Sequence, residues 1–222
     1  MEYISSGVTA AQGFVAGGIH CGIRKNKAKP DLAMIYSETP CNAAAVYTTN
    51  LVKGAPILVT KKNLADGKAK AVICNSGNAN TCNADGAEKA EKMCRIAAEV
   101  LGIEPQDVIV ASTGVIGQVL PIEPIENAAQ ALKDSLSPDG SSAAAAAIMT
   151  TDTIPKEVAV QTVIGGKTVK LGGISKGSGM IHPNMATMLC FLTTDCAIST
   201  AMLDRAIHKV TGNTCLLYTS DA

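Results

Sequence analysis

A glycine-rich segment that runs into an apolar strand carries the residue types best suited to chemistry. It reads GGISKGSGMIHPNMATMLCFLTTD over residues 172–195, and its apolar part begins at Thr187. A threonine hydroxyl is a poor nucleophile unless a base lies beside it. Cleavage between Ala186 and Thr187 would supply that base, because the new α-amino group titrates at about 7.7 to 8.0. On spacing alone, however, a plain loop before a strand explains the same residues.

The amino-acid sequences of this segment and of three earlier ones resemble those of a known enzyme family. KGSGMIHPNMATMLCFLTTD resembles the cleavage motif of the ornithine acetyltransferase family, also called the bifunctional glutamate N-acetyltransferase family of arginine biosynthesis. Three further strings resemble the same family in the same order: GVTAAQGFVAGGIHCGIR (7–24), NSGNANTC (75–82) with STGVIG (112–117), and AIMTTDT (147–153). The resemblance covers nearly the whole chain up to about residue 212, and four ordered motifs do not agree by chance.

The resemblance implies a self-processing enzyme. Family members cut themselves at the position that matches Ala186–Thr187, which gives an α chain and a β chain that stay together. Thr187 then takes an acetyl group from N-acetylornithine and passes it to glutamate by a ping-pong route. Some members also accept acetyl-CoA as donor. No cofactor is implied, acetyl-CoA would enter only as a substrate, and two α and two β chains are expected to associate.

The pair Thr113–Gly114 matches the family's oxyanion hole. A Thr-Gly turn directly after a strand can point two donors at one site, and the glycine lets the backbone approach closely. One such donor typically contributes about 3 to 4 kcal/mol of transition-state stabilisation. Taken alone, the same residues fit a plain turn that ends a strand.

Three residues match family positions that contact the amino-acid substrate, namely Thr150, Lys176 and Thr187 itself. A lysine suits an α-carboxylate as a point charge. Without the resemblance, Lys176 would be taken for a solvated loop charge. Thr151 or Asp152 could serve in place of Thr150.

The histidines and cysteines indicate no metal site. His182 lies in the loop before the cleavage position and could assist cleavage, whereas His20 and His208 are interpreted as structural or exposed. The cysteine spacings fit no common zinc pattern. We expect the eight cysteines to be reduced, mostly buried thiols of a cytoplasmic protein.

Composition excludes several functional classes. Hydrophobic residues make up 47% of the 222 residues and charged residues 17%, which is typical of a globular protein. The formal net charge of +0 argues against a nucleic-acid partner. The start, MEYISSGVTAAQGF, shows no secretory signal, and the apolar runs stop far short of the roughly 20 residues of a membrane span.

Periodicity and turn residues predict an α/β fold. Strands are expected at 31–37, 44–50, 56–62, 70–76, 107–113 and 187–195, the last one buried and central to a sheet. Helices are expected at 84–101, 121–136 and 199–210 and from residue 141 onward, with a hairpin turn at Gly165–Gly166. We expect mixed sheets packed between helix layers, in the self-processed α/β-chain acetyltransferase fold that the resemblance implies.

Three segments are expected along the chain. Residues 1–186 form the α chain, residues 187–214 begin a β chain that is cut short, and residues 215–222 resemble translated sequencing-library adapter. Family members carry a β chain comparable in size to the α chain. We therefore expect the 222-residue chain to be inactive and poorly soluble by itself. A self-cleaving β-aminopeptidase that uses water as acceptor, and an inert fragment, are the alternatives.

Overall fold

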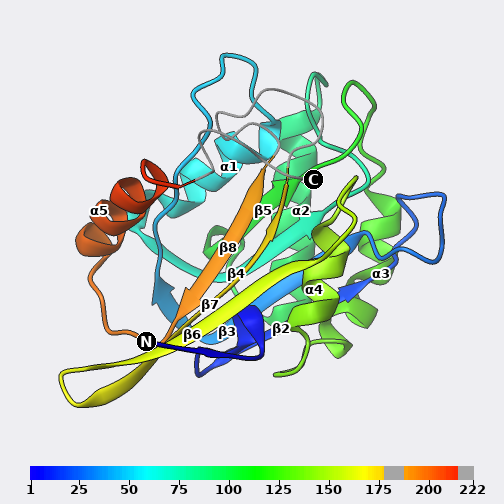
Figure 1. Cartoon of the computed structure of the whole chain (residues 1–222). Helices are drawn as coiled ribbons and strands as arrows, with labels where there is room; N and C mark the ends of the chain where they lie inside the picture. Colours follow the sequence, from blue (N-terminus) through cyan, green and yellow to red (C-terminus); the bar gives the residue numbers. More distant parts are fainter. Residues whose placement is uncertain (178–187, 215–222) are drawn as a thin grey trace.

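Two four-stranded sheets and five α-helices make up the computed structural model, which describes residues 1–177 and 188–214 (Figure 1). Sheet A has the strand order β1 (Glu2–Ile4), β6 (Lys156–Ile164), β7 (Lys167–Lys176), β8 (Leu189–Thr194). Sheet B has the order β2 (Phe14–Ile19), β3 (Leu32–Asn42), β4 (Lys68–Asn75), β5 (Val108–Ser112). The helices are α1 (Ala55–Asn63), α2 (Gly86–Leu101), α3 (Glu123–Asp134), α4 (Ser141–Ile148) and α5 (Thr200–Thr211).

The two sheets differ in strand direction. All pairs in sheet A are antiparallel, whereas sheet B is mixed, because β4 and β5 run parallel. Parallel neighbours need a long crossover, and α2 supplies it between these two strands. The α/β class predicted from the sequence is confirmed.

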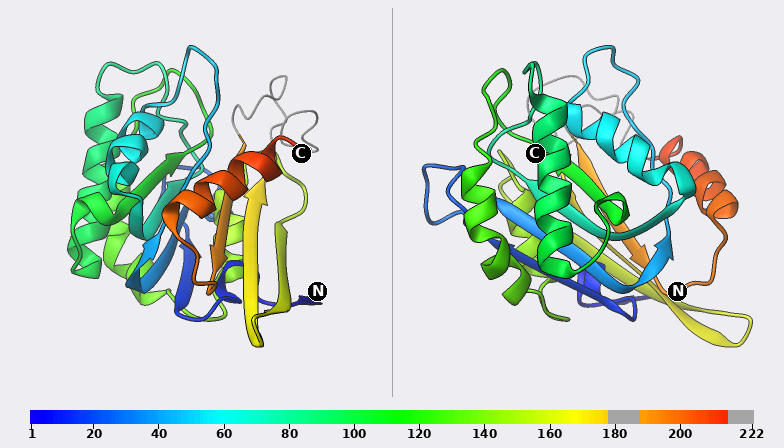
Figure 2. Two further views of the ribbon diagram at one scale, coloured as in Figure 1. Left: turned by 90° about the vertical axis from the view of Figure 1, so that its left-hand side faces the viewer. Right: turned by 180° about the vertical axis from the view of Figure 1, so that it is seen from behind.

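A layer of helices covers the outer face of sheet B. In the left view of Figure 2, α1, α2 and α3 lie on one side of sheet B and sheet A lies on the other. Apolar side chains from these helices and from sheet B form one core, which includes Leu32, Ile73, Met93, Ile125 and Leu132. Full burial of one such side chain contributes about 1.5 to 3 kcal/mol, so this layer is a main source of stability.

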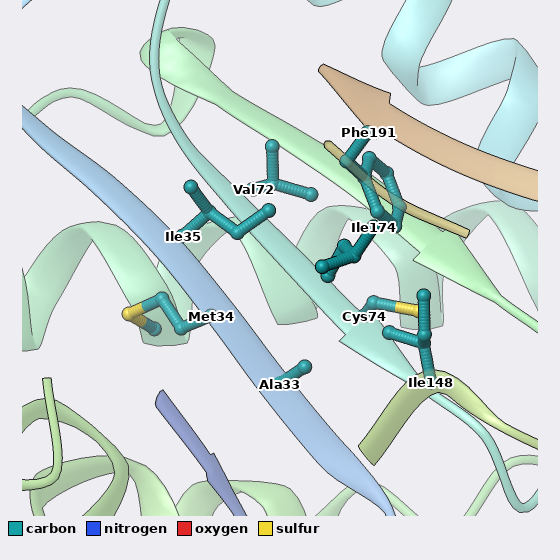
Figure 3. A pocket seen from close by; sticks show the side chains of 8 residues that line it. All are labelled: Ala33, Met34, Ile35, Val72, Cys74, Ile148, Ile174 and Phe191. Carbon is teal, nitrogen blue, oxygen red and sulfur yellow. The ribbon is translucent and has the colours of Figure 1, made fainter. Parts of the chain in front are cut away.

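A second core lies between the two sheets. Figure 3 shows side chains from β3, β4, β7, β8 and α4 converging there, among them Ile35, Cys74, Ile148, Ile174 and Phe191. All the side chains that line this space are apolar, with a single thiol among them. It is the interior of the fold and not a ligand site.

Helix α4 touches strand β2 along a seam of small residues. A Cβ on Gly18 would lie 2.2 Å from the Ala143 carbonyl oxygen, and one on Gly140 would lie 1.7 Å from the Ala16 carbonyl oxygen. The alanines of α4 that face inward are fully buried. Any larger side chain on either partner would push the helix away, so the run of alanines is a packing requirement.

Most of the predicted elements are confirmed. The strands at 31–37, 70–76 and 107–113 correspond to β3, β4 and β5, and the four predicted helices correspond to α2, α3, α4 and α5. The predicted hairpin joins β6 to β7. Its turn residues Gly165 and Gly166 have φ of 58° and 77°, as a two-residue turn of type I′ requires.

Two predicted strands are wrong. Residues 56–62 lie in α1, because Pro56 fits the first turn of a helix and Val59 and Thr60 recur at helical spacing on the buried side. The Thr60 hydroxyl also donates to the Val110 carbonyl at 2.7 Å, which holds the helix on β5. Residues 44–50 form no regular element, since the chain leaves sheet B where β3 ends.

Strand β8 is not the buried central strand that was predicted. Within the described part of the chain it pairs only with β7 and forms the edge of sheet A. One face packs on the inter-sheet core, while the outer face exposes Leu192 to 54%, beside Val158 at 53% and Leu171 at 44%. We call these three residues the outer face of sheet A. The predicted strand start at Thr187 lies outside the described residues.

Candidate functional site

The carboxyl ends of β4 and β5 place two loops side by side. The strands pair in parallel, and their last partners are Asn75 and Ser112. Parallel strands end at the same edge of a sheet, so the segments 75–81 and 112–118 leave sheet B together. An isolated parallel bridge continues the pairing beyond the strands. We call these two segments the paired loops.

The turn at Thr113–Gly114 is held tightly against its neighbour. The Thr113 amide donates to the Asn75 carbonyl at 2.9 Å, and Thr113 is buried. Gly114 has φ of 127°, and a Cβ on it would lie 2.6 Å from the Gly77 carbonyl carbon and 2.8 Å from the Asn78 nitrogen. Only glycine fits this approach. Within the described residues neither the Thr113 hydroxyl nor the Gly114 amide has a hydrogen-bond partner, so both are able to donate to a substrate.

Two buried asparagines brace the paired loops. Asn75 donates through Nδ2 to the Ser112 hydroxyl at 2.7 Å and accepts through Oδ1 from the Gly77 and Asn78 amides at 3.3 and 3.1 Å. Asn78 in turn donates to the Gln118 carbonyl at 2.9 Å. In the sequence, Asn75 and Asn78 stand out only as part of the string NSGNANTC. Their role could have been suspected because asparagine readily bonds to the backbone of its own loop.

Asp152 organises the segment that follows α4. Its carboxylate accepts from the Thr150 amide at 3.2 Å, the Gly177 amide at 2.8 Å and the Lys156 ammonium at 2.8 Å. Burial alone would raise the pKa of Asp152, yet these hydrogen bonds together hold it below its ordinary value. Its oxygens are thus engaged in structural bonds, and Thr151 is exposed. Of the three residues considered for substrate contact, Thr150 is the one that remains half-buried with an unengaged side chain in the described structure.

Lys176 is a buried cation and not a solvated loop charge. It ends β7 with 2% exposure, and its Nζ donates to the Gly177 carbonyl at 2.5 Å. Burial lowers the pKa of Lys176, and the negative charge of Asp152 partly opposes this. Burial likewise raises the pKa of the neighbouring Cys74 thiol to about 12. A buried ammonium is costly unless an anion balances it, which suits a substrate carboxylate.

The predicted site residues that the structure describes lie at one edge of the molecule. Cys74 of β4 and Ile174 of β7 belong to the same inter-sheet core, and both strands end within two residues of them. Lys176 therefore lies near the strand end from which the paired loops leave. Lys176 also pairs with Leu189, the first residue of β8. Segments that are distant in sequence thus meet here.

Several predicted residues fall elsewhere. Ala186, Thr187 and His182 lie outside the described residues. His20 contacts the Lys29 carbonyl and the buried Asp31 carboxylate, in line with a structural role. His208 is exposed on α5.

A surface hollow of about 540 Å³ lies apart from these residues. It is lined by the segment 43–47, by residues around Leu64–Gly67 and by the start of α5, and it includes none of the predicted site residues. Across residues 1–177 and 188–214, no group of three His, Cys, Asp or Glu side chains could hold a metal ion. No described helix is long and apolar enough to cross a membrane. The cysteines of the described residues are free thiols.

Curated relatives match all or nearly all of the chain. The "Arginine biosynthesis bifunctional protein ArgJ" of Symbiobacterium thermophilum is 50% identical over 223 residues, which is 100% of this chain and 56% of the relative. The protein of the same name from Gloeobacter violaceus is 53% identical and covers 95% of this chain and 52% of its own length. This chain therefore spans about half the length of the curated relatives.

Solved structures have the same fold. The crystal structure of the arginine biosynthesis bifunctional protein argJ from Bacillus halodurans matches with a TM-score of 0.77 at 44% identity, over 84% of this chain and 97% of that one. The ornithine acetyltransferase of Mycobacterium tuberculosis, solved with ornithine, matches with 0.74 at 36% identity, over 83% and 96%. An aminopeptidase of Ochrobactrum anthropi, described as a variant of the Ntn-hydrolase fold, shares the fold alone at 14% identity and a TM-score of 0.58.

The family assignment agrees with the geometry. Thr113, Gly114 and Lys176 belong to strings that resemble the family's motifs, and relatives at about 50% identity cover 95% or more of the chain. Residues 15–221 match the family model described as "ArgJ family", and the chain belongs to the ArgJ family.

Proposed function

We propose that the protein, at the length of its relatives, moves an acetyl group from N-acetylornithine to glutamate through an acetyl-Thr187 intermediate. The names of the relatives and the ornithine complex of the Mycobacterium tuberculosis enzyme support these substrates. The observation that carries the proposal is the Thr113–Gly114 turn, whose hydroxyl and amide are unengaged within the described residues while its backbone is fixed by contact with Gly77. Such preorganised donors suit the oxyanion of acyl transfer.

The first step of the proposal is self-cleavage at Ala186–Thr187. The Thr187 hydroxyl oxygen attacks the Ala186 carbonyl carbon, the peptide C–N bond breaks, and an ester links the two parts. Water then hydrolyses this ester, which leaves a carboxylate on Ala186 and a free α-amino group on Thr187. That amine lies next to the hydroxyl and has a pKa suited to act as its base.

Acetyl transfer follows by two similar displacements. The Thr187 hydroxyl gives its proton to the α-amine, and its oxygen attacks the acetyl carbonyl of N-acetylornithine. The oxyanion accepts hydrogen bonds from the Thr113 hydroxyl and the Gly114 amide, the C–N bond breaks, and ornithine leaves with the proton. The amine of glutamate then attacks the acetyl ester, and the Thr187 hydroxyl is restored. Acetyl-CoA would donate through the same ester.

Lys176 and Thr150 are proposed to bind the amino-acid part of the substrate. The α-carboxylate would lie against the buried ammonium of Lys176, on which the negative charge of Asp152 also acts. Thr150 lies on the segment that Asp152 ties to Gly177, directly after Lys176. One carboxylate thus fixes the positions of both proposed binding residues.

The lengths of the matches support division into two chains. This chain covers about half of each curated relative but 97% of the Bacillus halodurans crystal chain. That match takes in 84% of this chain, which is the share that residues 1–186 make of 222. A relative divided near the position of Ala186–Thr187 would give these proportions. An assembly of two α and two β chains is part of the proposal.

The test uses residues 1–214 continued by the carboxyl-terminal half of the Symbiobacterium thermophilum relative, which we call the extended chain. Intact mass and amino-terminal sequencing should show a fragment that begins at Thr187, while Thr187→Ala stays uncut and Thr187→Ser cuts slowly. The purified enzyme should transfer acetyl from N-acetylornithine to glutamate. A new terminus elsewhere would overturn the cleavage assignment. Release of a β-peptide amide with water as acceptor, without acetyl transfer, would favour a β-aminopeptidase-like hydrolase.

A further inference from the structure

The loop between β2 and β3 is folded around a buried carboxylate. Asp31 is fully buried and accepts from the Cys21 amide at 2.6 Å and from the Arg24 amide at 2.7 Å. Its own carbonyl accepts from the Ser76 amide at 3.0 Å. These bonds fix the end of the string 7–24, a string that the proposed reaction does not otherwise use. The bond to the Arg24 amide fixes the backbone from which the Arg24 side chain extends.

The guanidinium of Arg24 bonds to two backbone carbonyls from distant parts of the chain. Nε and Nη2 donate to the Ser76 carbonyl at 3.0 and 2.6 Å. Nη2 also donates to the Met149 carbonyl. A planar group with several fixed donors can serve two acceptors at once, which a lysine ammonium at the end of a flexible stem does less well.

Each of these carbonyls stands next to a different part of the site. Ser76 precedes Gly77, whose carbonyl carbon fixes the approach of Gly114. Met149 precedes Thr150, and its carbonyl belongs to the carboxyl end of α4, where a cation is favourable. Among the described residues, no other hydrogen bond joins the segment 75–81 to the segment 149–152.

Two carboxylates act on the charge of Arg24. Burial lowers the pKa of Arg24, and the negative charges of Asp31 and Asp152 partly oppose this. Asp31 holds the backbone of Arg24, while Asp152 holds the backbone of Thr150 and Gly177. The guanidinium therefore stands between the two carboxylates that order the two sides of the site.

We infer that Arg24 is a positioning residue that fixes the distance between the oxyanion turn and the substrate-binding segment. This inference rests on the proposed function. Without the guanidinium, the oxyanion turn and the substrate-binding segment would each still form, but they would be misplaced relative to one another. A displacement of about 1 Å between reacting groups costs roughly a hundredfold in rate. The loss should appear in kcat, because each half still carries its own binding groups.

The experiment compares Arg24→Ala, Arg24→Lys and the exposed neighbour Lys25→Ala in the extended chain. Arg24→Ala should lower kcat for acetyl transfer about a hundredfold with KM within about threefold, and millimolar methylguanidine should restore at least a tenth of it. Arg24→Lys should restore activity only in part, and Lys25→Ala should behave as the unmodified protein. Normal kcat in Arg24→Ala, or a loss that methylguanidine does not restore, would overturn the inference.

A second measurement does not depend on activity. Amide hydrogen exchange followed by mass spectrometry should show faster exchange in Arg24→Ala over both 75–81 and 149–152, with little change in α2. Faster exchange in only one of them, or across the whole protein, would mean that Arg24 does not couple the two sides. If the unmodified protein transfers no acetyl group, the proposed function fails, and the exchange result still decides whether Arg24 joins the segments.

Discussion

The paired loops and the edge at β8 are built in opposite ways. In the paired loops, the hydrogen bonds run within the segment 75–81 and across to the segment 112–118, and the asparagines that make them are buried. At the edge, β8 has one strand partner among the described residues, and its outer side chains face solvent. The local positions of the proposed oxyanion donors, Thr113 and Gly114, are therefore set by residues within 75–118. The surroundings of β8 depend instead on packing beyond its own sheet.

The largest expected effect comes from filling the contact beneath the oxyanion turn. Gly114→Val should lower kcat of the extended chain about a hundredfold or more with a modest change in KM, because the new Cβ displaces the backbone from Gly77. Gly117→Val is the matched control, since Gly117 also has positive φ but nothing lies within 4 Å of its Cβ position. Steady-state kinetics of both variants decide the matter. A raised KM with intact kcat would assign Gly114 to binding.

A smaller effect is expected from removing the brace of the paired loops. Asn75→Ala should lower the free energy of unfolding by about 2 to 3 kcal/mol, because it removes the side-chain partner of the buried Asn78 amide and of the half-buried Gly77 amide and Ser112 hydroxyl. Urea unfolding measures this. Asn83→Ala is the control, because the bond that Asn83 donates to the Gln118 carbonyl is exposed. Equal losses in the two variants would show that burial of the brace is unimportant.

The stability that the Asp152 carboxylate provides should depend on pH. Asp152→Asn should lower the free energy of unfolding by about 1 to 2 kcal/mol at neutral pH, since a charged acceptor of three hydrogen bonds is lost. The folded pKa of Asp152 is depressed, so this stabilisation is present above the unfolded pKa of about 3.9 and is lost as pH falls through the lower folded value.

Unfolding curves between neutral pH and acid test this dependence. The exposed Asp139→Asn should follow the unmodified protein at every pH. If the gap between Asp152→Asn and the unmodified protein stayed constant into acid, ionisation of Asp152 would not be its cause.

The smallest effect on stability is expected at the outer face of sheet A. Leu192→Lys should change the free energy of unfolding by no more than about 0.5 kcal/mol while it reduces self-association of the 222-residue chain. Leu189→Lys, on the core-facing side of the same strand, should destabilise clearly more. Light scattering and urea unfolding compare them. Unchanged self-association in Leu192→Lys would show that this face is not what drives it.

Local chemistry explains which parts of the fold were predictable. The hairpin at Gly165–Gly166 and the helix ending at Gly102 follow from turn and cap residues, and both are present. In 56–62 the branched residues that favoured a strand also suit a helix whose buried face meets β5, and Pro56 was the better guide. The edge position of β8 could not be predicted from the sequence, because strand order depends on pairing between distant segments.

The candidate site divides in the same manner. Four site residues were predicted from the resemblance of short strings to family motifs, namely Thr113, Gly114, Thr150 and Lys176. The structure places these four at one edge of the molecule. The local bonds of Asn75 and Asp152, to partners two to four residues away, could have been suspected from residue type, whereas those to Ser112 and Gly177 depend on folding. For Arg24 the difficulty is greatest, since its two carbonyl partners lie 52 and 125 residues away in sequence.

The seam between α4 and β2 has a consequence for motion. Glycine and alanine have no side-chain rotamers to order or to exchange, so their contact loses little entropy on folding and offers no alternative packing. The main chains of Gly18 and Ala143 meet directly, and the carboxyl end of α4 leads straight to Thr150. We therefore expect the backbone at Thr150 to move less at a given temperature than it would if α4 were held on β2 by long side chains with several rotamers.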